Sequence, residues 1–101
     1  YRLIPRFARA IVMKFGGDEV LEMYFRVREN LLDPNFKGLT FYHAISAFTK
    51  SHLSANINED VAELRLALGG IGYSHFVEIG EILKDIDVHT TWEGDNKVLL
   101  Q

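Results

Sequence analysis

One segment near the C-terminal end of the chain places two carboxylates beside an aromatic residue: Thr91-Trp92-Glu93-Gly94-Asp95-Asn96. Asp95 or Asn96 is suited to cap a following helix, because a short polar side chain accepts hydrogen bonds from free main-chain N–H groups. Two carboxylates separated by one Gly also suit weak binding of a cation. Glu93 has Trp92 as an apolar wall, an environment that makes a carboxylate a stronger base. From these residues alone, the helix cap is the favoured interpretation.

Three glycines occur within four residues at Gly69-Gly70-Ile71-Gly72. The run superficially resembles a loop that binds dinucleotide phosphates, but that loop follows a β-strand and opens a helix. Here the preceding residues have the apolar spacing of a long helix. We therefore interpret the run as a helix terminator, because glycine adopts the left-handed backbone that ends helices without steric cost.

Other kinds of site find little support. The chain has no cysteine, which excludes disulfides and thiolate metal ligands. No two of its four histidines have the four-residue spacing of a helical zinc site. His89 is near Asp85 and Asp87, but in a segment expected to be irregular. No Ser or Thr has the surroundings of a nucleophile elbow, so acyl-transfer chemistry is not indicated.

The elements that must position these residues are helical. In residues 1–31, apolar residues recur at three- and four-residue steps with charged residues between them, which predicts a helix. Gly16-Gly17 weakens this pattern, and we expect a break there or a close approach of another backbone. Residues 33–38 form a turn-rich connector, because Pro34 fixes φ and the flanking Asp33 and Asn35 cap their own backbone.

A second helix is predicted over residues 40–68, whose apolar stripe ends at the glycine run. Ser, Thr, Asn and His are frequent between Ser46 and Asn58, so one side of this helix should make partly polar contacts. A short third helix over residues 76–83, an irregular segment over 84–92 and a last helical turn complete the chain. The predicted fold class is all-α, a bundle of helices without strands.

Composition and charge describe an ordinary globular domain. A net charge of −3 and a pI near 5.8 give no reason to expect nucleic acid or an anionic membrane as a partner. No apolar run approaches the ~18 residues that cross a bilayer. An apolar face begins at once with Leu3, and the last helix stops after about one turn, too short to hold by itself. We therefore expect a piece of a longer protein.

Two blocks of the sequence resemble blocks of one family, the peroxisomal acyl-CoA oxidases. Residues 91–101 look like the family's T-W/F-E-G-D/E-N-x-V-x-x-x-Q, and residues 65–75 are similar to its R-x-A-C-G-G-H-G-Y-S-H. The interval from Tyr73 to Glu93 also matches without insertion, and the first helix resembles the family more loosely. The resemblance covers essentially the whole chain, and two blocks at matched spacing make it specific.

The resemblance implies a fold and a reaction. The family belongs to the acyl-CoA dehydrogenase superfamily, and residues 1–101 correspond to part of one C-terminal α-helical domain, without the N-terminal helical and β domains. Glu93 is implied as the base that takes the α-proton of a fatty acyl-CoA, while the β-hydrogen leaves as hydride to FAD. The product is a trans-2-enoyl-CoA, and molecular oxygen becomes hydrogen peroxide. The main-chain N–H of Glu93 is one of the family's donors to the thioester oxygen.

The resemblance also implies binding residues and partners. Contacts with FAD are implied for Gly69, Gly70, Gly94, Asp95 and Asn96. In the dehydrogenase branch the glycine loop meets the flavin across a dimer interface, so a homodimer is expected. That branch usually has Y-E-G-T where this chain has W-E-G-D, which favours the oxidases. The implied location is the peroxisome.

The chain departs from the family's pattern at several positions. Leu68 and Ile71 stand in place of the usual Cys and His, Val77-Glu78 in place of Ser-Gly, and Gly80 and Val88 in place of Pro. These changes leave two alternatives open. The protein is an oxidase with a diverged substrate pocket, or it is a non-catalytic oxidase-like module with a structural or interaction role in a larger assembly.

Overall fold

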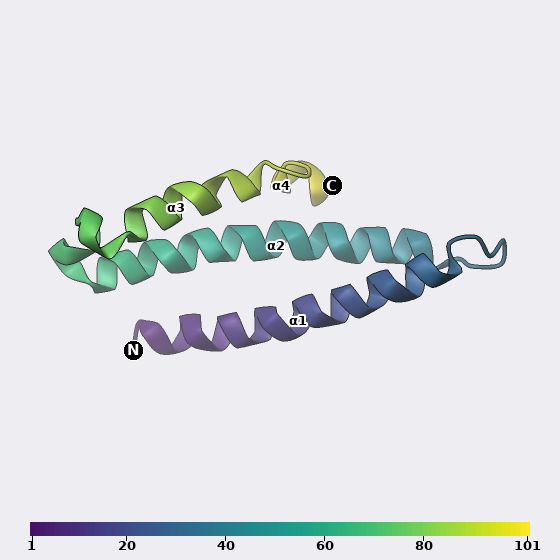
Figure 1. Cartoon of the computed structure of the whole chain (residues 1–101), viewed down its shortest axis with the longest axis horizontal. Coiled ribbons are helices and arrows are strands. Elements are labelled where there is room, and N and C mark those ends of the chain that lie inside the picture. The colour runs from purple at the N-terminus through teal and green to yellow at the C-terminus, as the bar shows by residue number, and fades with distance from the viewer.

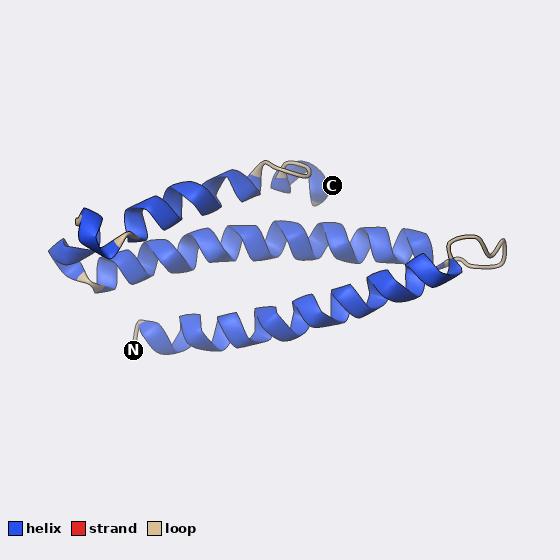
Figure 2. Cartoon of the chain, viewed as in Figure 1, coloured by secondary structure: helices blue, strands red, loops and turns tan.

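The computed structural model describes all residues, 1–101. Two long helices, α1 (Leu3–Asn30) and α2 (Gly38–Ala67), form an antiparallel hairpin across a connector of residues 31–37. The chain then turns back, and α3 (Ile79–Asp87) runs along the side of α2 away from α1, followed by the single turn α4 (Asn96–Leu99) (Figure 1). No strand is present (Figure 2), so the prediction of an all-α fold is confirmed.

The first helix is continuous. α1 spans nearly the predicted range, but the expectation of a break or a close approach at Gly16-Gly17 is wrong, because the helix passes through both glycines. A Cβ atom at either position would meet nothing within 4 Å, so no other backbone of this chain packs closely against these glycines. A glycine costs roughly 1 kcal/mol in a helix interior, and packing along α2 outweighs that cost over 28 residues.

The end of α2 agrees with the prediction from the glycine run. Gly69 has a φ of +63°, a left-handed backbone that glycine adopts without strain. The main-chain N–H of Leu68 donates to the carbonyl of Leu64 at 3.2 Å, which completes the last helical turn. A 3-10 turn, Gly69–Tyr73, follows directly. The glycine run therefore terminates a helix, as interpreted from the sequence.

The third helix lies later in the chain than expected. α3 begins at Ile79 rather than near residue 76, and it continues to Asp87 through part of the segment predicted to be irregular. Two short 3-10 turns, His75–Val77 and Val88–Thr90, flank it. Apolar residues at positions 79, 82, 83 and 86 explain the shift, because this spacing continues one helical face beyond Leu83.

Very little of this chain is buried. Only five residues are, and the one large apolar side chain among them is Val27. The accessible surface is 7871 Å², compared with about 5,800 Å² for a compact protein of this mass. The radius of gyration is 17.0 Å, compared with about 13 Å for a compact domain. Large side chains such as Phe7, Phe15 and Phe76 remain exposed. The helices therefore form an open layer whose apolar faces this chain does not cover.

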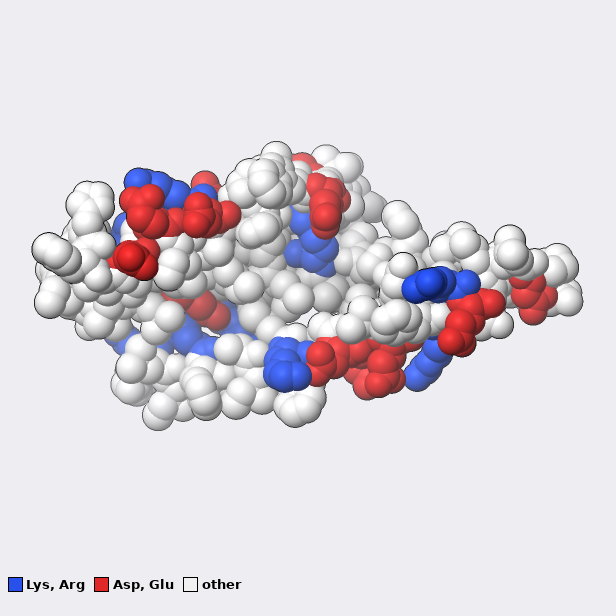
Figure 3. Space-filling view, viewed as in Figure 1, with Lys and Arg blue, Asp and Glu red and all other residues white.

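The charged residues of both signs lie close together on one face of the molecule. Over the face drawn in Figure 3, acidic and basic side chains are interspersed, with large areas that carry neither. This distribution agrees with the small net charge of −3. No helix combines the length and the apolar composition that crossing a membrane requires.

Candidate active site

A cavity of about 610 Å³ lies between the middle of α2 and the segment that follows α3. Half of its eight lining residues are apolar, and one is the predicted base: Lys50, Leu53, Ser54, Ile57, Ile86, His89, Trp92 and Glu93. The rings of His89 and Trp92 meet edge to face, with centroids 5.8 Å apart. The cavity thus combines apolar walls with a carboxylate, an ammonium group and an imidazole.

Glu93 presents polar groups to this cavity that no other residue of the chain engages. Its side chain is exposed and makes no hydrogen bond or ion pair within the chain, and its main-chain N–H also has no acceptor. Its φ of +59° is in the left-handed region, which costs a non-glycine residue of order 1–3 kcal/mol and persists where the surroundings hold it. Both the carboxylate and the N–H are therefore available to a molecule in the cavity.

Gly94 continues the left-handed turn with a φ of +105°. A Cβ atom at this position would lie 2.9 Å from the Leu99 side chain, so α4 packs directly against the glycine. Its carbonyl accepts a hydrogen bond from the Lys50 ammonium of α2. The residue after the predicted base is thus confined by both its conformation and its contacts.

Asp95 caps α4, as one of the sequence interpretations expected. Its Oδ1 accepts from the main-chain N–H of Lys97 at 2.9 Å and of Val98 at 3.4 Å. These are two of the N–H groups that a helix leaves without a partner at its start. The cap holds in place a helix of only four residues.

The Asn96 side chain points back onto α2, where all of its hydrogen-bonding groups are occupied. Its Nδ2 donates to the Ser51 carbonyl at 3.1 Å and to Ser54 Oγ at 2.8 Å, while its Oδ1 accepts from Lys50 at 2.9 Å. The single proton of Ser54 goes to the Lys50 carbonyl at 2.8 Å, so this hydroxyl is the acceptor in its closest contact with Asn96. Ser51, only 2% exposed, and Ser54 are therefore buried with partners.

The predicted site residues do not all come together within one chain. Glu93, Gly94, Asp95 and Asn96 lie against the middle of α2, whereas Gly69 and Gly70 lie beyond its C-terminal end. Fifteen residues separate position 54 from position 69, which along a helix corresponds to about 22 Å. The structure thus presents two separate groups, one at each end of α3 (Figure 1).

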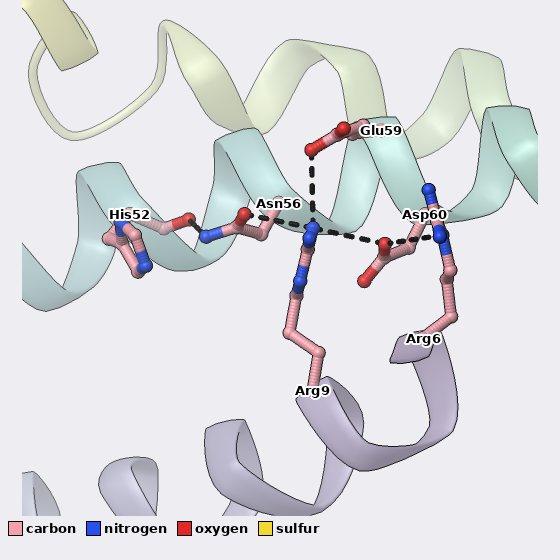
Figure 4. A network of polar contacts seen from close by, with 6 residues as sticks. All are labelled: Arg6, Arg9, His52, Asn56, Glu59 and Asp60. Carbon is pink, nitrogen blue, oxygen red and sulfur yellow. Dashed lines mark hydrogen bonds and ion pairs between the residues drawn. The ribbon is translucent and has the colours of Figure 1, made fainter. Parts of the chain in front are cut away.

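A second polar cluster joins the opposite side of α2 to α1 (Figure 4). Arg9 Nη1 donates to oxygens of Asn56 at 3.0 Å, Glu59 at 3.2 Å and Asp60 at 3.0 Å. Arg6 Nε lies 3.5 Å from the same Asp60 carboxylate, an ion pair without hydrogen-bond geometry. This cluster is remote from Glu93 and joins two helices rather than lining the cavity.

Sequence reasoning missed several residues of the cavity. No sequence motif pointed to three of the lining residues: Lys50, Ser54 and His89. The polar composition of residues 46–58 had indicated only that one side of α2 makes polar contacts. That composition is the only local signal for Lys50 and Ser54, because their partners Gly94 and Asn96 lie 44 and 42 positions further along the chain. No three His, Asp or Glu side chains anywhere in the chain come close enough to hold a metal ion.

Comparison with known proteins identifies close counterparts of the whole chain. The sequence profile described as "Acyl-CoA oxidase, C-alpha1 domain" matches residues 1–101. Acyl-coenzyme A oxidase acox-1.1 of Caenorhabditis elegans is 34% identical over 100 residues, and peroxisomal acyl-coenzyme A oxidase 1 is 33% identical in Mus musculus and 32% in Homo sapiens. Each alignment covers 99% of this chain but 15% of the relative, so the chain spans about a seventh of those proteins. No solved structure matches.

Proposed function

The chain belongs to the acyl-CoA oxidase family as its C-alpha1 domain, and from this premise we propose that the full-length protein oxidises fatty acyl-CoA to trans-2-enoyl-CoA. Molecular oxygen is the proposed final acceptor and hydrogen peroxide the second product. Glu93 is the proposed base for the α-proton. The observation that carries the proposal is an exposed carboxylate without a partner, beside its own free main-chain N–H, on a cavity with apolar walls.

The chemistry proposed for Glu93 needs both of its free groups. Its carboxylate accepts the proton from the α-carbon, a transfer that requires a base held within hydrogen-bond distance of that carbon. Its main-chain N–H donates to the thioester oxygen, which gains negative charge as the proton leaves. Trp92 lines the same cavity as Glu93 and supplies apolar surface beside the carboxylate.

The residues of the turn are compatible with a flavin close to the backbone. The main-chain N–H groups of Glu93 and Gly94 have no acceptor in the chain, so both are available to a bound molecule. When bound, FAD supplies the acceptor for the β-hydride and passes the electrons to oxygen. We propose that Gly94, Asp95 and Asn96 contact it, the last two mainly through main-chain atoms, because their side chains are engaged with α4 and α2.

Gly69 and Gly70 are proposed to contact FAD from a different direction. Within one chain they lie about 22 Å from the left-handed turn at Glu93 and Gly94, which we call the Glu93 turn. This distance is too long for the glycine loop and the Glu93 turn to meet the same edge of one flavin. A homodimer in which the glycine loop of one subunit reaches the flavin of the other resolves this separation. Exposed apolar residues beside the loop, among them Ile71 and Phe76, are suited to such an interface.

The location proposed for the full-length protein is the peroxisome. Several relatives at about 33% identity carry that location in their names. Fatty acyl-CoA and oxygen are the proposed substrates because the same relatives are named acyl-coenzyme A oxidases.

Substitution of Glu93 by Gln tests the proposal. Gln keeps the size and hydrogen-bonding capacity of Glu but does not take the α-proton at neutral pH. The full-length variant should fold and bind both FAD and acyl-CoA, while flavin reduction in a single turnover falls by ~10²–10⁴-fold. Glu78→Gln is the matched control, because Glu78 is also exposed and has a similar left-handed backbone, with a φ of +58°.

Each outcome of this experiment has a distinct meaning. Flavin reduction in Glu93→Gln at close to the wild-type rate would show that the base is elsewhere. A wild-type protein whose flavin is not reduced by any acyl-CoA would favour the non-catalytic module. Reduction followed by electron transfer only to a protein acceptor, without peroxide, would place the protein with the dehydrogenases.

A further inference from the structure

We propose that Lys50 is a positioning residue that fixes the Glu93 turn on α2 and thereby aims the carboxylate. The inference rests on the proposed function of Glu93 and adds a residue that the family blocks do not contain. The Lys50 ammonium donates to the carbonyl of Gly94 and, at 2.9 Å, to Oδ1 of Asn96. It thus holds the chain on both sides of Asp95, directly after the predicted base.

The turn needs support from outside because its own contacts do not hold it. Glu93 and Gly94 both have left-handed backbones, and a non-glycine residue keeps that conformation only when its surroundings impose it. Trp92 donates back to Val88, and the next hydrogen bonds within the segment are those of the Asp95 cap. Between these points the bond from Lys50 to the Gly94 carbonyl is the only hydrogen bond that the chain supplies.

Lys50 is suited to this role because nothing else competes for it. No carboxylate lies within ion-pair distance of its ammonium, whereas Lys14 and Lys84 each pair with an acidic residue on their own helix. Two of the three ammonium hydrogens therefore go to neutral oxygens of the turn. Hydrogen bonds from a charged donor are stronger than those between neutral groups, so this contact is well able to oppose the strain.

The residues around Lys50 hold its partner in place. The Asn96 amide, whose Oδ1 accepts from Lys50, also donates to the Ser51 carbonyl and to Ser54 Oγ. Both serines are buried on one face of α2, one helical turn apart. Because the two serines hold the Asn96 amide on α2, its Oδ1 is a fixed acceptor for the Lys50 ammonium. Lys50 and Glu93 line the same cavity, so displacement of the turn would move the carboxylate relative to any substrate there.

Lys50→Met in the full-length flavoprotein tests the inference, because Met keeps the apolar stem and removes the three donors. With saturating FAD we expect the KM for acyl-CoA to stay near wild type, while single-turnover flavin reduction falls by about 10- to 100-fold, as for a base displaced by about 1 Å. Lys50→Arg restores cationic donors and should recover most of the rate. Lys84→Met, which removes an exposed lysine from α3, is the control and should keep the wild-type rate.

Hydrogen exchange at the amides of α4 supplies a readout independent of catalysis. Exchange there should be at least about tenfold faster in Lys50→Met than in wild type, because the support of the turn is lost. If wild-type flavin is not reduced by acyl-CoA, the proposed function fails, and exchange still decides whether Lys50 fixes the turn. Unchanged exchange in Lys50→Met would overturn the inference, as would an unchanged reduction rate or a higher KM with unchanged kcat.

Ser54→Ala covers the case in which Lys50→Met does not fold. It removes the hydroxyl that accepts from Asn96 but leaves the ammonium of Lys50 in place. The expected result is a smaller loss in the same direction, a few-fold slower flavin reduction with unchanged KM and faster exchange in α4. Wild-type values for both the rate and the exchange would contradict the role given to this network.

Discussion

α2 makes polar contacts on both sides, and the contact toward α1 differs in kind from the contact toward α4. Toward α1, Arg9 donates to three oxygens and Asp60 also pairs with Arg6, so charges meet opposite charges. Toward α4, the contact consists of an amide, two serines and one lysine, without any carboxylate. The first joins two helices of about 30 residues, and the second holds a single turn.

The difference indicates how strictly each contact fixes the relative position of the two elements that it joins. The contact toward α1 contains ion pairs besides its hydrogen bonds, and because Coulomb energy falls slowly with distance, part of that energy persists when one helix shifts along the other. Hydrogen bonds weaken steeply when their direction changes, so a network built from them fixes one geometry. The contact with α1 is therefore suited to stability, and the contact with α4 to the placement of Glu93. Three predictions test this comparison.

The largest effect on stability is expected from Asp60→Ala. The substitution leaves Arg6 and Arg9 without their shared partner in a part-buried position and should cost about 2–4 kcal/mol. The measurement is the opening free energy from hydrogen exchange at the amides of α1. Asp18→Ala, which breaks an exposed pair with Lys14, should cost only about 0.3–0.5 kcal/mol. Equal costs for the two variants, or a large loss of flavin reduction in Asp60→Ala, would break the comparison.

A smaller effect is expected from replacing either left-handed glutamate by glycine. Glu78→Gly and Glu93→Gly should each stabilise the local structure by about 0.5–1 kcal/mol, because glycine adopts a positive φ without strain. Hydrogen exchange at the amides of α3 and α4 measures the gain. Only Glu93→Gly should also lose single-turnover flavin reduction, because it removes the carboxylate of the proposed base. Loss of the reaction in both variants would remove the distinction between the two ends of α3.

The smallest effect is expected from the exposed pair on α3. A hydrogen bond from Lys84 at 2.9 Å and the charge of that ammonium hold the pKa of the Glu81 carboxyl below its ordinary value. Because the pKa is lowered on folding, the stability that the pair contributes is present above the ordinary pKa and is lost as the pH falls through the folded value. In Lys84→Met the Glu81 carboxyl should titrate closer to its ordinary pKa. The ¹³C resonance of this carboxyl, recorded as a function of pH, measures the change. An unchanged titration would show that Lys84 is not the cause.

The sequence correctly predicted the features that depend on neighbouring residues. The spacing of apolar side chains indicated α1 and α2, and the run at Gly69 indicated the end of α2. The cap of α4 by Asp95 was one of the interpretations left open. The family, predicted from two blocks, is established by the match over residues 1–101. The role of Glu93 as a base stays a prediction, because it depends on how a substrate and a flavin are bound beside it.

Local sequence determined the helices, their ends and the residues with chemical potential, because a helix, a cap and a left-handed turn each depend on residues a few positions apart. Only the tertiary structure decided which of these residues meet. Lys50 and Gly94 are 44 positions apart, and no local pattern relates them. The same holds for Arg9 and Asp60, 51 positions apart. Contacts at such separations depend on how two helices are aligned, and packing over their whole length sets that alignment.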